Sequence, residues 1–166
     1  MKPMTSPARS RRLVGVSALA CSAVLVTSCV GSVQGFTNRA PDGNPIDAAR
    51  ALPDAPGVVR EGSAATSCGE FVLEQGEKLP AEAIAYLTTA TEADEAELAW
   101  SHPTTEGDPI VYFAYVAGWN VGVGLSMTNE FDSYGGDYGW TVLSCPDATT
   151  ATNPASISQC DELIEG

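Results

Sequence analysis

The residue types best suited to contact a ligand gather in one stretch, NEFDSYGGDYGW, which spans residues 129–140. Aromatic faces beside carboxylate acceptors on a glycine-rich loop suit a sugar or a cationic peptide. The alternatives are a wide hairpin whose aromatic side chains fold back over a sheet, and a calcium site, although the alternating oxygen ligands of an EF-hand loop are missing. The residues that we assign to ligand contact are Asp132, Tyr134, Asp137, Tyr138 and Trp140.

Motifs for catalysis are scarce. His102 is the only histidine, and because Pro103 follows it, the backbone there is extended and the side chain is expected in a surface turn. GLSMT, residues 124–128, lacks the closing glycine of a nucleophile elbow and falls in a strand pattern. The sequence contains no GxGxxG, Walker or HExxH motif and no CxxC pair. We therefore predict no catalytic residue, no metal and no cofactor.

The amino terminus has the pattern of an export signal. Residues 1–12 are basic, and the apolar run over residues 13–26 would rise only about 21 Å as a helix, too short for a hydrocarbon core of about 30 Å. VTSC, residues 26–29, resembles the bacterial lipobox, in which the thiol of the cysteine receives a diacylglyceryl group. This resemblance implies lipid attachment at Cys29, and two or more acyl chains hold a protein firmly on a membrane.

Three alternatives concern this segment. Cys21, in SALAC, is a competing attachment site with a shorter apolar run before it. The second alternative is that an ordinary signal peptidase cleaves the chain. SRRLV, residues 10–14, resembles the start of a twin-arginine signal but lacks the bulky residues expected after it, so the export route stays open.

Export places the remaining cysteines where disulfides persist. With Cys21 removed and Cys29 acylated, three cysteines are left, so one thiol stays free or pairs between molecules. Our preferred pair is Cys145 with Cys160, whose loop of about 15 residues would stabilise the fold by about 3 kcal/mol. The alternative joins Cys68 to Cys145.

The charge distribution excludes some partners. Residues 29–166 carry all 21 acids and four basic residues, a formal charge of −17. This field repels phosphate backbones and anionic headgroups, so nucleic acid is not expected as a partner. Most of the acids are expected to form a solvated face.

Four segments follow from these patterns. Residues 1–28 are predicted to be a lipoprotein signal peptide, and residues 29–67, rich in Pro and Gly, a flexible tether. IDAARAL, within the tether, is compatible with a short helix but has no identifiable partner. Residues 68–146 are predicted to form the globular domain and residues 147–166 a polar tail pinned by the disulfide, with at most a short helix over residues 158–164.

Within the domain, apolar periodicity predicts a strand over residues 70–75 and a helix over residues 80–91. Four more strands are predicted over residues 96–100, 109–116, 121–128 and 139–145, the third with a strict period of two that buries one face. Turn residues between them favour an antiparallel meander. The predicted fold class is α+β: two layers, with an antiparallel sheet of four or five strands and one covering helix.

The whole chain resembles the small lipoproteins of unknown function that are common in actinobacteria, specifically over residues 9–29 and only in architecture beyond them. The resemblance implies a protein anchored on the extracytoplasmic face of the bacterial cell membrane, with no activity attached. We expect a binding or interaction module whose partner is an envelope protein or a glycan. The alternatives are an envelope hydrolase using paired carboxylates such as Asp132 and Asp137, and a purely structural envelope protein.

Overall fold

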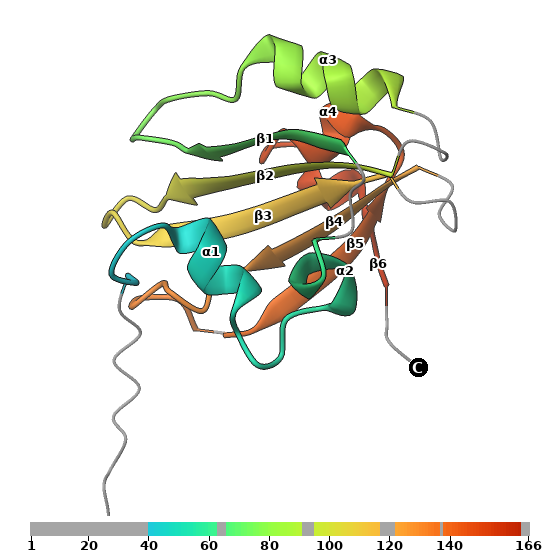
Figure 1. Cartoon of the computed structure of the whole chain (residues 1–166). Coiled ribbons are helices and arrows are strands. Elements are labelled where there is room, and N and C mark those ends of the chain that lie inside the picture. Colours follow the sequence, from blue (N-terminus) through green and yellow to red (C-terminus); the bar gives the residue numbers. More distant parts are fainter. Residues whose placement is uncertain (1–39, 63–65, 91–94, 117–121, 137, 164–166) are drawn as a thin grey trace, which may run out of the picture. The chain divides into compact units, whose positions relative to one another are not determined.

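The computed structural model describes residues 40–62, 66–90, 95–116, 122–136 and 138–163. They form an α+β fold around one mixed sheet of six strands in the order β1-β2-β3-β4-β5-β6 (Figure 1). The strands are β1 (Thr66–Val72), β2 (Ala96–Pro103), β3 (Pro109–Tyr115), β4 (Val123–Thr128), β5 (Trp140–Cys145) and β6 (Asp161–Glu162). The helices are α1 (Pro45–Arg50), α2 (Gly57–Arg60), α3 (Ala81–Thr89) and α4 (Ala148–Ala151), with the 3-10 turn η1 (Ile157–Gln159).

Four strands, from β2 to β5, form the predicted antiparallel meander, and β6, which was not predicted, extends it by pairing antiparallel with β5. β1 differs, because it runs parallel to β2 with a register shift between Ser67 and Gly69. A parallel neighbour requires a crossover rather than a hairpin, and α3 lies on that crossover. The sheet is therefore mixed and has six strands, where the prediction was an antiparallel sheet of four or five.

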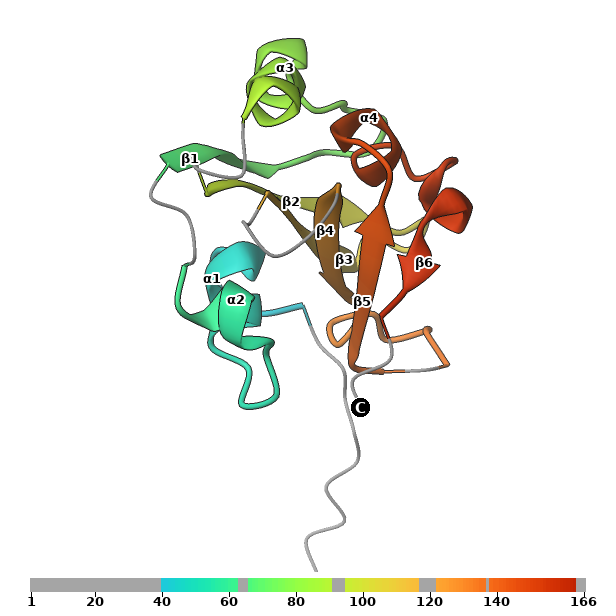
Figure 2. The same cartoon turned by 90° about the vertical axis from the view of Figure 1, so that its right-hand side faces the viewer.

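Helices cover both faces of the sheet, so the predicted two layers with one covering helix are wrong. α3 and α4 lie on one face, and α1 and α2 lie on the other (Figure 2). The first face buries Leu98, Trp100 and Leu125 with Leu87 of α3, and the second buries Phe113 with Ile46 of α1. Burial from both sides explains why β2 has six consecutive buried residues.

The two helices on the second face come from the predicted tether, which is wrong for residues 45–60. The prolines there begin short helices instead of keeping the chain extended. Pro45 is the first residue of α1, and the Asn44 side chain caps this helix by accepting a hydrogen bond from the Ile46 N–H at 2.9 Å. Pro56 caps α2. Ile46 and Val59 are then fully buried against the sheet.

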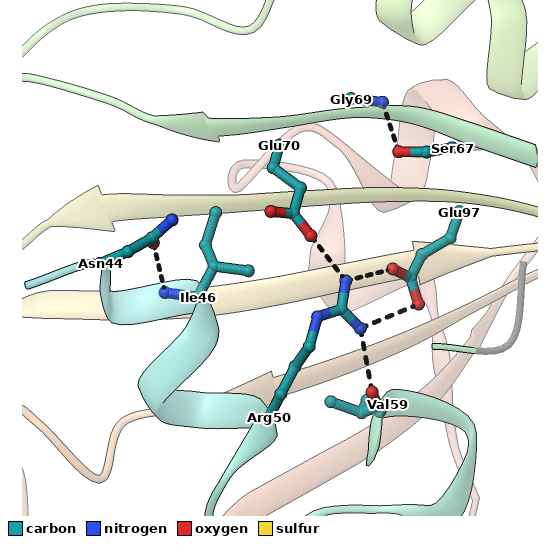
Figure 3. Close-up of polar contacts among 8 residues, drawn as sticks. All are labelled: Asn44, Ile46, Arg50, Val59, Ser67, Gly69, Glu70 and Glu97. Carbon is teal, nitrogen blue, oxygen red and sulfur yellow. Dashed lines mark hydrogen bonds and ion pairs between the residues drawn. The ribbon is translucent and has the colours of Figure 1, made fainter. Parts of the chain in front are cut away.

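Arg50, at the end of α1, fastens this helix to the sheet (Figure 3). Its Nη2 donates to Glu97 of β2 at 2.5 Å and to Glu70 of β1 at 2.9 Å, and its Nη1 donates to the Val59 carbonyl at 2.9 Å. The guanidinium also lies 4.7 Å from the centre of the Phe113 ring. Burial alone would lower the pKa of Arg50, but the two carboxylates outweigh it and raise the pKa. The ion pair with Arg50 neutralises the carboxylate of Glu97, a side chain that is only 7% exposed.

β4 is buried on both faces, although its sequence predicted burial of one face. Val123 and Leu125 pack in the core beneath α4, and on the other face Gly124 and Ser126 are also buried. Tyr115 lies across them: a Cβ at Gly124 would be 2.2 Å from the Tyr115 ring, so only glycine fits. The Tyr115 hydroxyl lies 3.4 Å from the Ser126 hydroxyl. The small and polar residues of β4 thus accommodate an aromatic ring rather than face water.

The predicted tail folds onto the sheet instead of extending from it. Asp147 caps α4 by accepting a hydrogen bond from the Thr150 N–H at 2.7 Å, and Ala151 is fully buried. In place of the short helix predicted over residues 158–164, the chain forms η1 and then β6, which pairs with β5. Residues 148–163 therefore belong to the domain.

We expect Arg50→Met to destabilise the fold by about 3–5 kcal/mol, because it leaves the Glu97 carboxylate buried without its cation. Urea unfolding measures this change. Glu70→Gln is the matched control: its carboxylate is 41% exposed, so its loss should cost less than about 1 kcal/mol. Equal effects of the two substitutions would contradict the role given to the Arg50–Glu97 pair.

Candidate binding groove

The loop predicted to bind a ligand is divided between the core and the solvent. Phe131 is 8% exposed and packs with Val111 and Phe113, while Trp140 packs against the Phe113 ring with a centroid distance of 6.0 Å. Tyr134 and Tyr138 are 76% and 46% exposed. The loop therefore does not gather its aromatic residues around one site.

One acid of this loop, Asp132, has a structural function. Asp132 Oδ1 accepts a hydrogen bond from the Tyr134 N–H at 2.9 Å, which fixes the turn. Asp108, in the turn between β2 and β3, accepts a bond from the Ser133 N–H at 2.8 Å and ties the two loops together. Asp137 lies outside the described residues, so a carboxylate pair of Asp132 with Asp137 stays a prediction. Cys29 also lies outside the described residues.

A groove of about 500 Å³ lies on the face of the sheet that carries α3 and α4. Its volume falls within the range of about 300–1,000 Å³ that is usual for ligand sites. Two other cavities in the described part of the chain, beside α1 and beside Arg50, measure about 220 and 280 Å³. The groove is lined by Leu73, Gly76, Glu77, Lys78, Leu79, Ile84, Trp100, His102, Thr152, Asn153 and Pro154.

Three separate parts of the chain build the groove. β2 contributes Trp100 and His102, which lie two residues apart on one face of the strand. The crossover from β1 to β2 contributes residues 73–79 and Ile84 of α3, and the turn after α4 contributes residues 152–154. Trp100 is only 2% exposed and stacks on Tyr112, with ring centres 5.0 Å apart and planes 6° from parallel. This stack gives the groove a rigid aromatic base.

His102 supplies a defined hydrogen-bonding group to this groove. Its Nδ1 lies 2.9 Å from the Pro103 carbonyl oxygen. Because a carbonyl oxygen only accepts, Nδ1 is the donor of this hydrogen bond. His102 is half-buried rather than a residue of an exposed turn, because β2 continues to Pro103. His102 thus lines the groove with a ring whose Nδ1 is already hydrogen-bonded.

Other polar groups of the lining already have partners. The Thr152 hydroxyl donates to the Ala148 carbonyl at 2.7 Å, and the Asn153 amide donates to the Ser156 hydroxyl at 3.0 Å. The Glu77 carboxylate accepts from the Glu74 N–H at 2.9 Å. Lys78 makes no ion pair or hydrogen bond with any described residue. Its ammonium group is therefore available to a ligand.

The disulfide joins Cys145 to Cys160, the preferred pair, with Cα atoms 4.3 Å apart. It closes residues 146–159 into a loop, and this loop carries the 152–154 wall of the groove. Cys68 is a free thiol. Burial raises the pKa of Cys68, and the nearby Glu97 carboxylate adds to the effect, so the protonated form is favoured at neutral pH.

The sequence contained one indication of this groove. Extending the predicted strand at residues 96–100 by two residues places His102 on the same face as Trp100, because side chains alternate along a strand. The opposite wall could not be found in this way, because residues 152–154 lie about 50 positions away in the sequence and belong to a predicted polar tail.

The chain significantly matches no protein-family model, no curated protein and no solved structure. Within the described ranges, none of the helices has the length and apolar character needed to cross a lipid bilayer. The same residues contain no cluster of three or more His, Cys, Asp or Glu side chains that could hold a metal ion.

We expect Cys160→Ser to destabilise the protein by about 3 kcal/mol and to loosen the groove wall. Amide hydrogen exchange of residues 148–160 should accelerate, because these residues lose their covalent link to β5. Cys68→Ser is the control, since Cys68 takes no part in the disulfide. Unchanged exchange in the Cys160 variant would show that packing alone holds the wall.

Proposed function

We propose that the protein is an exported, lipid-anchored bacterial envelope protein that binds a small ligand in the groove beneath α3. The groove carries the proposal: its volume, rigid aromatic base and few available polar groups are typical of a small-molecule site. This proposal moves the binding site from the loop at residues 129–140 to the opposite face of the sheet.

Two observations support the compartment. VTSC, ending at Cys29, resembles a lipobox and follows an apolar run too short to span a bilayer. The Cys145–Cys160 disulfide is typical of proteins that fold in oxidising compartments. We therefore infer attachment at the extracytoplasmic face of the cell membrane, with Cys29 as the lipid-bearing residue.

The intact mass of the membrane-extracted protein tests the anchor. We expect a chain that begins at Cys29 and carries a diacylglyceryl group, and we expect Cys29→Ala to abolish this species. Cys21→Ala is the matched control, because it removes the competing cysteine within the apolar run and should leave the mass unchanged. A lipid-free species from the unmodified chain would contradict the anchor.

A neutral fluorescent probe, N-phenyl-1-naphthylamine, tests the groove in the full chain carrying Cys29→Ser. We expect its fluorescence to rise on binding and this rise to be lost in Ile84→Trp, because the larger side chain fills the groove. Ala85→Trp is the matched control: Ala85 is the next residue of α3 and is exposed. Equal binding by both variants would place the probe elsewhere and contradict the proposal.

A further inference from the structure

We propose that the ligand of the groove is an amphiphilic carboxylic acid, whose apolar body lies along the groove and whose carboxylate pairs with Lys78. This inference rests on the proposed function, because it specifies the chemical class of the ligand for the same groove.

The lining first defines the body of the ligand. Leu73, Leu79, Ile84 and Pro154 present aliphatic surface around Trp100. Burying apolar ligand surface against such a lining is favourable by roughly 25 cal/mol per Å². Because the polar groups of Thr152 and Asn153 bond within their own turn, that wall does not demand a hydrogen-bonding partner from the ligand. A flexible hydrocarbon or ring system therefore suits most of the groove.

The charges of the described residues then define the head group. Three described residues are permanently cationic: Arg50, Arg60 and Lys78. Arg50 is paired with two carboxylates, and Arg60 donates to the Ala55 carbonyl at 2.6 Å. Lys78 alone among them has no partner, and it lines the groove. An unpaired cation at the edge of an apolar groove favours a ligand with one anionic group.

The acidic character of the whole domain acts against this pairing, but at longer range. At physiological ionic strength, charges more than about 8 Å apart are largely screened. Glu77 also lines the groove, but its carboxylate accepts a hydrogen bond from the Glu74 N–H. Among the described lining residues Lys78 is the one permanent cation, so it is the group that attracts a bound carboxylate, and the charge of Glu77 selects against ligands with several negative charges.

Displacement of N-phenyl-1-naphthylamine by octanoate, octanol and octylamine tests the inference in the full chain carrying Cys29→Ser. We expect octanoate to bind at least as tightly as octanol and more tightly than octylamine. Lys78→Gln should weaken octanoate by about three-fold, the range of an exposed ion pair, and leave octanol unchanged. Arg60→Gln is the control, since it removes one positive charge from α2 on the other face of the sheet.

The outcomes separate the two proposals. If octanol displaces the probe more strongly than octanoate, or if Lys78→Gln leaves octanoate unaffected, the carboxylic acid class is wrong while the groove remains a binding site. If octylamine binds most tightly, the head group is cationic and the inference is overturned. If the probe itself does not bind, the proposed function fails and the inference fails with it.

Discussion

The ion pair between Arg50 and Glu97 is the constraint on which the second face of the sheet depends. Glu97 lies on β2, a strand covered on both faces, and a carboxylate in such a position is costly unless a cation neutralises it. Arg50 supplies that cation from α1, donates to the Val59 carbonyl as α2 ends, and covers the Phe113 ring. One side chain thus links both short helices to the sheet, and their apolar residues close the core there.

The groove on the opposite face follows from two long connections. Because β1 and β2 are parallel, the chain must cross over the sheet between them, and this crossover places residues 73–79 and α3 above Trp100. The chain after β5 returns over the same face through α4, and the disulfide holds it there. Both connections line the groove, with Trp100 and His102 of β2 between them in the lining.

The two faces of the sheet therefore differ in the polar groups that they carry and in how these groups are paired. The face under α1 and α2 buries charged and hydroxyl groups that are satisfied within the protein, including Glu97 and Ser126. The groove face leaves Lys78 without a described partner beside apolar surface.

Much of the strand order was determined by the sequence alone, because alternation and turn residues are local properties, and they predicted the meander from β2 to β5. Helical periodicity predicted α3, and the short loop between Cys145 and Cys160 favoured their pairing. Tertiary structure decided the rest. Pro45 and Pro56 indicate a tether as readily as they begin helices, and the tertiary contacts of Arg50 with Glu97 and the burial of Ile46 and Val59 favour the helices. Likewise, His102 and Asn153 line the same groove only because the fold brings β2 close to the turn after α4. A site formed by segments that lie far apart in the sequence leaves no local pattern from which it could be predicted.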